Sequence, residues 1–260
     1  MKKAVCIIPA RLGSYRFPGK ALHPIYGLPM IEHVYKRATL ASQIDQVYVA
    51  TPNEEIVDAV DRFGGAYIRT TDDVRRGSDR VAQAVAGLGY EIVVNLQGDE
   101  PLVRPDTLDR AVRSLAENPE LQCVNVVYLA DHQHAEDENE VKVVTDSHDF
   151  MMYLSREPIP AKWFGDKEFK HKICLGLMVF SKASLELYAS LPSTPLEIIE
   201  SIDQLRFLEH QIPIKVLTDN KETHSVDSPD DIAKVEALML HDEVARTYCT
   251  TIPPARTASG

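Results

Sequence analysis

The sequence predicts an α/β fold: a doubly wound, mostly parallel sheet with a small mixed-strand lobe. Two observations support this. Short apolar runs alternate with helical patterns through the first half of the chain, residues 4–129. Strands separated by helices in this way run parallel, and the helices cover both faces of the sheet. The alternation breaks at about residues 140–180 and resumes afterwards.

In the first half, each predicted strand is a short apolar run and each helix has an apolar stripe. The run Ala4–Ile8 is too short for a signal peptide and ends in Pro9-Ala10-Arg11, so it predicts a buried first strand. Glycines close two of the helices, at Gly64-Gly65 and at Gly89. The predicted strands are Ala4–Ile8, Gln46–Ala50, Tyr67–Arg69, Ile92–Leu96 and Cys123–Leu129, and the predicted helices are Met30–Leu40, Glu54–Phe63, Ser78–Leu88 and Pro105–Leu115.

The region of about 140–180 holds strand-like runs without helices between them, at Val141–Val144, Met151–Leu154 and Ile173–Phe180. We interpret it as an antiparallel or mixed lobe that contacts a substrate or a second subunit. Helices are expected next at Ala183–Leu191 and Leu196–His210, then a strand at Ile214–Thr218 and a final helix after Pro229. We expect one domain, residues 1–248, and a flexible tail, residues 249–260, which is small, polar and contains proline.

The composition excludes several classes of protein. The formal net charge is -11, which argues against broad binding of nucleic acids or anionic membranes. No run approaches the ~20 apolar residues that a membrane span requires. The four cysteines are far apart in the sequence and form no C-x-x-C pair, which indicates free thiols rather than disulfides or a zinc site. We therefore expect a cytoplasmic protein with small-molecule partners.

Ligands of open α/β sheets bind beyond the carboxyl ends of the strands, which directs attention to the loop after the first strand. The segment Arg11–Lys20 reads RLGSYRFPGK and combines three basic side chains with two glycines and a serine. Exposed N–H groups and fixed cations of this kind suit a triphosphate. The spacing does not match a P-loop, because five residues separate Gly13 from Gly19 and Ala21 supplies no hydroxyl. A merely basic surface loop is the alternative.

Two carboxylates follow predicted strands. Asp99 lies in the segment NLQGDEP just past the most apolar strand, and Asp227 lies in VDSPDD before the last helix. A carboxylate in such a position can hold Mg²⁺, a hard cation that takes few protein carboxylates and keeps several waters. Taken alone, each could equally be an ordinary turn or capping residue.

Together, these segments are far more specific than any one of them. R-x-x-S-x-R-x-P-G-K near the N-terminus, Q-G-D-x-P near residue 100 and V-D-S-P-D-D near residue 230 resemble the CMP-Kdo synthetases, the 3-deoxy-manno-octulosonate cytidylyltransferases. The resemblance runs from about Ala4 to Leu238, with the motifs in the family's order. It implies a Rossmann-like nucleotidyltransferase that transfers CMP from CTP to an acidic sugar with release of pyrophosphate, for surface polysaccharide or lipopolysaccharide biosynthesis, and that forms a homodimer.

The resemblance also implies roles for individual residues. The implied catalytic residues are Arg11, Lys20, Asp99 and Asp227, of which Asp99 and Asp227 bind Mg²⁺. The CTP site comprises Arg11, Ser14, Arg16, Lys20, Gly77, Ser78 and Arg80. The acceptor site comprises Gln97, Arg156, Cys174, Met178, Glu197, Glu200 and Gln204. At 100° per residue, Glu197, Glu200 and Gln204 share one face of the predicted helix, although a solvated face is the alternative.

The acceptor segment departs from the family pattern. Relatives commonly have His-Leu-Gly-Ile-Tyr where this chain has Cys174-Leu175-Gly176-Leu177-Met178, so a histidine and a tyrosine are replaced. Losing two polar contacts changes the acceptor or weakens its binding. The resemblance implies Kdo or a Kdo-like acid as the acceptor. The alternatives are a nonulosonic acid or a phosphonate as acceptor, or a nucleotide-binding regulator without turnover.

Overall fold

The computed structural model describes residues 2–14, 16–74, 76–161, 169–220 and 223–254. Its first half has the predicted alternation of strands and helices. The elements are β1 (Ala4–Pro9), a 3₁₀ helix η1 (Lys20–Leu22), β2 (Pro24–Ile25), β3 (Leu28–Pro29), α1 (Met30–Thr39), β4 (Gln46–Thr51), α2 (Glu54–Arg62), β5 (Tyr67–Arg69), α3 (Gly77–Val85), β6 (Ile92–Leu96), α4 (Pro105–Glu117), β7 (Cys123–Ala130) and α5 (His132–Ala135).

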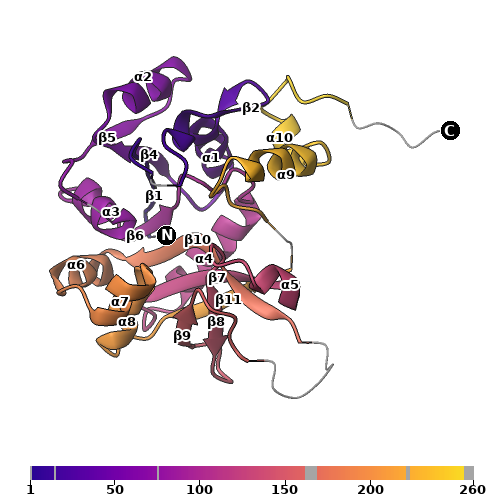
Figure 1. Ribbon diagram of the computed structural model, residues 1–260. Coiled ribbons are helices and arrows are strands. Elements are labelled where there is room, and N and C mark those ends of the chain that lie inside the picture. Colours follow the sequence, from indigo (N-terminus) through magenta and orange to yellow (C-terminus); the bar gives the residue numbers. More distant parts are fainter. Residues whose placement is uncertain (1, 15, 75, 162–168, 221–222, 255–260) are drawn as a thin grey trace.

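The second half begins with strands and continues with helices (Figure 1). The elements are β8 (Lys142–Thr145), β9 (Met151–Ser155), β10 (His171–Ser181), α6 (Lys182–Ser190), α7 (Pro195–Glu200), α8 (Gln204–Glu209), β11 (Lys215–Asp219), α9 (Asp230–Met239) and α10 (Glu243–Arg246). Among the described residues, no helix is long and apolar enough to cross a membrane.

One large sheet has the order β11-β7-β10-β6-β1-β4-β5. Strand β10 is antiparallel to both of its neighbours in this path, β6 and β7, and the other strands of the path run in one direction. Of the lobe predicted at about 140–180, the first two strands form the β8–β9 hairpin, which joins the same sheet through pairing of β8 with β10. The third strand of that prediction is β10, which lies inside the large sheet between β6 and β7, and residues 162–168 lie outside the described residues. The predicted fold class is therefore confirmed.

Alternate side chains of the first strand, β1, pack into two apolar layers on opposite faces of the sheet. Ala4, Cys6 and Ile8 pack in the layer that contains α1, α2 and α4. Val5 and Ile7 pack in the other, which contains α3, α6 and α8. Because both faces are covered, β1 is apolar along its whole length and β6 is apolar except at Asn95, as in buried parallel sheets generally. Most polar groups are thereby left to the loops at the strand ends.

The single helix predicted over 196–210 is wrong, because the structure has two short helices there. At the start of helix α7 the Thr194 N–H donates to Glu197 Oε2 at 3.1 Å, and the helix ends at Ser201 in a left-handed conformation, φ 54°. Helix α8 starts three residues later. The break removes the continuous helix face on which Glu197, Glu200 and Gln204 were predicted to lie together.

The C-terminal helices pack against the N-terminal half, beside α1 and β2 (Figure 1). Arg37 of α1 is fully buried and pairs with Asp242, while its Nε donates to the Tyr248 hydroxyl at 2.9 Å. The predicted flexible tail needs correction for its described part, 249–254. Cys249 and Ile252 are buried in an apolar cluster with Ile25 and Met30, because they cover the β2–β3 hairpin. Residues 255–260 of that prediction lie outside the described residues.

The packing of α1 against the C-terminal segment involves a buried histidine, His33, whose protonation would disturb it. Its side chain is fully buried, its Nε2 donates to the carbonyl of Ile25 at 2.9 Å, and its Nδ1 lies 3.0 Å from the Tyr248 hydroxyl. Burial, together with the charge of Arg37, lowers the pKa of His33 from 6.5 to about 4. The folded chain thus holds His33 neutral at pH values where the unfolded chain binds a proton.

Between pH 6.5 and about 4 the unfolded state binds more protons at His33, so stability falls as the pH is lowered through this window. We expect His33 to account for a loss of roughly 3 kcal/mol in the free energy of unfolding across it. Urea unfolding at a series of pH values measures this. The variant His33→Gln should flatten the dependence, and exposed His241→Gln should leave it unchanged. An equally steep dependence in His33→Gln would contradict the assignment.

Candidate active site

The loops after β1 and β6 meet at one edge of the sheet. The two strands are adjacent and parallel, so their carboxyl ends lie side by side. Gly98 is needed there, since a Cβ at this position would come within 3.1 Å of the Pro9 carbonyl oxygen. A third segment joins them where the Val226 N–H donates to the Asp99 carbonyl at 2.9 Å. Residues far apart in the sequence are brought together in this way.

Lys20 lies between the two carboxylates singled out in the sequence. Its Nζ donates to Asp99 Oδ2 at 2.6 Å and to the Val226 carbonyl at 2.9 Å, and it lies 3.7 Å from Asp227 Oδ1. Arg16 Nη2 contacts the same Asp227 oxygen at 2.5 Å. Four residues predicted from three motifs therefore form one cluster of two cations and two carboxylates.

The electrostatics of this cluster follow from its partial burial. Burial alone would lower the pKa of Lys20, but the charges of Asp99 and Asp227 raise it, so the ammonium stays charged. Burial and the negative charge of Asp99 raise the pKa of Asp227, against the opposing effects of Lys20 and Arg16. Two neighbouring carboxylates that repel each other are stabilised by a cation, and here Lys20 supplies it.

The same two carboxylates fit a magnesium ion. Mg²⁺ is bound in proteins by one or two carboxylates, and substrate phosphates and water complete its shell. Within the described residues, no group of three or more His, Cys, Asp or Glu side chains is arranged to hold a metal. Any ion here would therefore depend on a bound phosphate, which matches the chemistry expected of a nucleotide site.

Two adjoining cavities open beside the cluster. The first, about 600 Å³, is formed largely by the β1 loop, and predicted residues that line it are Arg11, Ser14, Arg16, Lys20, Gly77, Arg80, Gln97, Asp99 and Arg156. The second, about 590 Å³, adds Ser78, Met178, Gln204 and Asp227 from the predicted set. Because Arg11, Arg16, Asp99 and Arg156 border both, the cluster stands where two ligands would meet.

Arg156 is arranged as an anion-binding group. Its Nε donates to the Glu200 carbonyl at 2.8 Å and its Nη1 to the Glu138 carbonyl at 2.8 Å. Neutral carbonyls hold the guanidinium in place without cancelling its charge, and burial and the nearby Arg16 charge lower its pKa. A negatively charged ligand at the border of the two cavities would relieve this desolvated positive charge.

The predicted acceptor residues Glu197 and Glu200 require correction. Glu197 is completely buried and pairs with Arg206 at 2.6 Å and with Arg76 at 2.9 Å, so its carboxylate supports the protein instead of facing a ligand. Glu200 accepts hydrogen bonds from the Ser155 hydroxyl at 2.8 Å and the Arg156 N–H at 3.0 Å, which fixes α7 to β9. Of the three, only Gln204 lines the second cavity.

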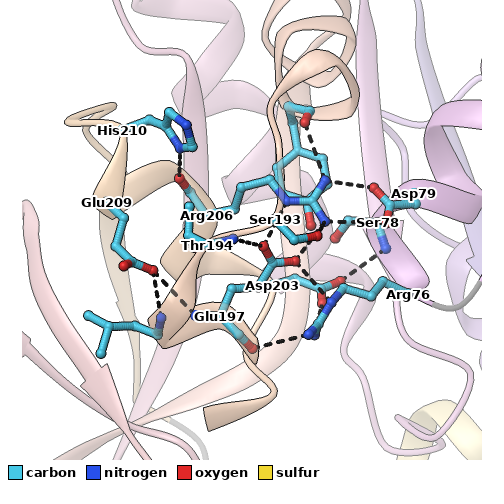
Figure 2. Close-up of polar contacts among 12 residues, drawn as sticks. Arg76, Ser78, Asp79, Ser193, Thr194, Glu197, Asp203, Arg206, Glu209 and His210 are labelled. Carbon is cyan, nitrogen blue, oxygen red and sulfur yellow. Dashed lines mark hydrogen bonds and ion pairs between the residues drawn. The ribbon is translucent and has the colours of Figure 1, made fainter. Parts of the chain in front are cut away.

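Arg76 was missed in the sequence, although it immediately precedes the Gly77-Ser78 motif. It borders both cavities, and its Nη1 lies 3.2 Å from Asp203 Oδ1. Asp203 Oδ2 in turn accepts the Ser78 N–H at 3.1 Å (Figure 2). These contacts link the loop before α3 to the segment between α7 and α8, and thus the walls of the two cavities to each other. The motif contained no signal for this, since the partner lies 125 residues away.

A small recess beyond the second cavity, about 140 Å³, was also not anticipated. Cys174 borders it, so this predicted acceptor residue lies beside the recess, while Met178 lies in the second cavity. Glu100, next to Asp99, borders the recess and is buried. Burial and the charge of Asp99 raise the pKa of Glu100 to about 8.

Comparison with known proteins assigns the family. The cytidylyltransferase family model matches residues 5–221. The chain is 39% identical over 241 residues to the 3-deoxy-manno-octulosonate cytidylyltransferase of Desulfosudis oleivorans, which covers 91% of the chain and 97% of that protein. The chain belongs to the cytidylyltransferase family. This cytidylyltransferase is also 39% identical over 250 residues to the 8-amino-3,8-dideoxy-manno-octulosonate cytidylyltransferase of Shewanella frigidimarina, covering 92% of the chain and 100% of that protein.

The fold of this cytidylyltransferase has a close solved counterpart. The structure of a CMP:2-keto-3-deoxy-manno-octonic acid synthetase complexed with CTP superposes with a TM-score of 0.85 at 35% identity, covering 92% of the chain and 99% of that protein. The resemblance stated from the motifs is thereby confirmed.

Gly176 of this cytidylyltransferase holds β10 against the β6 loop. Its N–H donates to Glu100 Oε1 at 2.7 Å and its carbonyl accepts the Gln97 N–H at 2.8 Å. A Cβ there would lie 2.8 Å from Glu100 Oε1 and 2.9 Å from Gln97 Cβ. We expect Gly176→Ala to lower the free energy of unfolding by about 1–3 kcal/mol.

Thermal and urea unfolding measure this effect. Gly89→Ala is the matched control, because nothing lies within 4 Å of a Cβ at Gly89. Equal free energies of unfolding for the two variants would show that close packing of β10 against the β6 loop at Gly176 does not contribute to stability.

Proposed function

We propose that the chain transfers CMP from CTP to 3-deoxy-manno-octulosonate (Kdo) or a close structural relative, releasing pyrophosphate. The observation that carries the proposal is the cluster of Lys20, Asp99 and Asp227 at the border of two cavities. One cavity has the cations that a triphosphate requires, and the other has polar groups suited to a sugar. Relatives named for this reaction cover nearly the whole chain.

In the reaction, an acceptor hydroxyl oxygen attacks the α-phosphorus of CTP. The new O–P bond forms as the bond from the α-phosphorus to the bridging oxygen breaks, and pyrophosphate leaves with that oxygen. Such transfers depend on positioning and charge stabilisation more than on covalent help from the protein. Arg11, Arg16 and Lys20 are placed to hold the phosphates, and Arg156 to hold the acceptor carboxylate.

We also propose that Asp99 and Asp227 bind Mg²⁺, which would stabilise the charge on the phosphates and lower the pKa of the attacking hydroxyl. Lys20 then keeps the two carboxylates together and compensates their charge in the absence of the ion. The homodimer and the cytoplasmic location expected from the sequence stay predictions.

Pyrophosphate release across a panel of acceptors tests the proposal. The panel holds Kdo, its 8-amino analogue, a sialic acid, a simple phosphonate and a control without acceptor, each with CTP and Mg²⁺. We expect release with an octulosonic acid and CTP, and no comparable rate with ATP, GTP or UTP. Release with only the phosphonate or the sialic acid would replace the proposed acceptor. CTP binding without any release would favour a nucleotide-binding regulator.

A further inference from the structure

The segment 137–140, which joins α5 to β8, turns all four of its backbone carbonyls onto two cations. The ammonium of Lys142 donates to the first and the last of these carbonyls, at 2.9 and 2.7 Å. Nη1 of Arg156 donates to the middle two, at 2.8 and 3.4 Å. Carbonyls of a surface loop are otherwise satisfied by water, so the two cations determine the conformation of this segment.

Lys142 also holds Arg156 directly. Its ammonium donates to the backbone carbonyl of Arg156. Lys142 lies in β8, where it is paired with Ser155 of β9 on one side and with Ile173 of β10 on the other. The main chain of Arg156 is therefore fixed by Lys142, and its guanidinium is fixed by the segment that Lys142 organises.

The environment of the Lys142 ammonium is unusual for a lysine. The residue is fully buried, and among the described residues no carboxylate forms an ion pair with it. Three backbone carbonyls accept its three N–H donors instead. Burial lowers the pKa of Lys142, against the opposing charges of Asp137 and Glu140. Because removing an ammonium from water is costly, the lysine adds little to stability for its size, whereas its three bonds fix the geometry around Arg156.

The groups that Lys142 holds form one wall of the second cavity. Asn139, Val141 and Arg156 line this cavity, and Arg156 also borders the first. The Val141 carbonyl accepts the Cys174 N–H at 2.8 Å, which ties the same wall to β10. A guanidinium binds a carboxylate strongly only when its N–H groups point at the carboxylate oxygens, so the position of this wall matters for an acidic ligand.

We propose that Lys142 is a positioning residue of the acceptor site, which holds Arg156 and the segment 137–140 in the arrangement that binds the acceptor carboxylate. This inference rests on the proposed function. Lys142 is not among the described residues that line the two cavities, so it acts through Arg156 and not by contact with a ligand. Loss of Lys142 should therefore weaken acceptor binding and leave the phosphate chemistry at Lys20 and Asp99 unchanged.

The first test is the variant Lys142→Met, which keeps the length of the side chain and removes its donors. Pyrophosphate release is measured with CTP and Mg²⁺ while Kdo is varied, or its 8-amino analogue if only that acid is turned over. We expect KM for the acid to rise at least about tenfold, since hydrogen bonds to a charged group commonly contribute this much. The kcat and the KM for CTP should stay unchanged, as expected when only acceptor binding is lost.

Lys172→Met is the matched control. Lys172 lies in the neighbouring strand β10, is 25% exposed at its side chain and contacts Thr145 and Asp149. All three constants should match those of the unaltered protein. An unchanged KM for the acid in Lys142→Met, or an equal loss of CTP affinity and kcat, would overturn the inference alone. Release with neither acid by the unaltered protein would overturn the proposed function and the inference with it.

A double-mutant cycle tests whether Lys142 acts through Arg156. Arg156→Ala alone should raise KM for the acid, because it removes the group that binds the carboxylate. Adding Lys142→Met to Arg156→Ala should raise KM no further, since the group to be positioned is absent. Residues that act independently have additive effects, so additive changes in the logarithm of KM would overturn the inference.

A second pair of variants decides the inference if Lys142→Met fails to fold. The exposed Asp137 accepts the Asn139 N–H at its Oδ1, at 2.8 Å, and so holds the segment 137–140 from the solvent side. Asp137→Ala removes this bond, whereas Asp137→Asn removes the charge and keeps the accepting oxygen. We expect KM for the acid to be about fivefold higher in Asp137→Ala than in Asp137→Asn. Equal values in the two variants would overturn the inference.

Discussion

Replacing Asp99 with asparagine is expected to lower kcat about a thousandfold, because it removes charge stabilisation at the reacting phosphate. Asp99 Oδ2 receives the Lys20 ammonium at 2.6 Å, and Asp227 lies on the other side of the same ammonium. Asparagine keeps the size and one oxygen, but not the negative charge that holds a divalent cation. CTP should still bind through the basic loop. Steady-state pyrophosphate release and calorimetric CTP binding measure the two effects.

Asp106→Asn is the control for this substitution. Asp106 lies in the first turn of α4, pairs with Arg104 and is 61% exposed at its side chain. We expect its kcat to match that of the unaltered protein. The metal assignment would be wrong if Asp99→Asn retained a kcat close to that of Asp106→Asn while its melting temperature also stayed the same.

Replacing Arg206 with alanine is expected to lower the free energy of unfolding by about 3 kcal/mol, because it removes one of the two cations that pair with the buried Glu197 carboxylate. Arg206 is 3% exposed and Glu197 is fully buried, and the guanidinium makes two bonds to that carboxylate, at 2.6 and 2.9 Å (Figure 2). Its Nη1 also donates to Asp79 of α3 at 2.8 Å. The hydrogen bonds to Glu197 and Asp79 raise the pKa of Arg206 against the effect of burial.

Removing the Arg206 side chain should also disturb the active site. Arg76 shares Glu197 with Arg206, so the N-terminal end of α3, with Gly77 and Ser78, depends on this network. Urea unfolding measures the stability of Arg206→Ala. The exposed pair of Arg69 and Glu54 gives the control, because Arg69→Ala breaks a similar two-bond contact in solvent and should change stability little. Equal losses in the two variants would show that burial of Arg206 adds nothing.

Much of the fold could be predicted because the sheet is covered on both faces. Runs such as Ala4–Ile8 are apolar throughout, and helices of the first half carry a clear apolar stripe. The prediction of a single helix over 196–210 failed because local backbone conformation interrupts the apolar pattern there. Helix α7 ends because Ser201 adopts a left-handed conformation, which periodicity does not reveal. The packed state of Cys249 likewise depends on a partner, Tyr26, more than 200 residues away.

The nucleotide half of the site was predicted better than the acceptor half. Arg11, Lys20 and Asp99 stand in compact motifs in the loops after β1 and β6, Asp227 stands in one just before α9, and such motifs keep their neighbours in sequence and in space. The acceptor cavity is built from single residues of β10, α8 and the segment 139–141. A buried carboxylate such as Glu197 reads in sequence like a solvent-exposed one, so its ion pairs with Arg76 and Arg206 could not be anticipated.

Phosphorus NMR of one reaction mixture tests the central claim most directly. The mixture holds the protein, CTP, Mg²⁺ and Kdo or its 8-amino analogue, with a parallel sample without acceptor. Transfer of CMP predicts loss of the three CTP resonances together, growth of pyrophosphate, and a single new phosphodiester resonance that requires the acceptor. CTP that remains unchanged with both acceptors, or that yields CMP or CDP without a phosphodiester, would contradict the assignment of this site to CMP transfer.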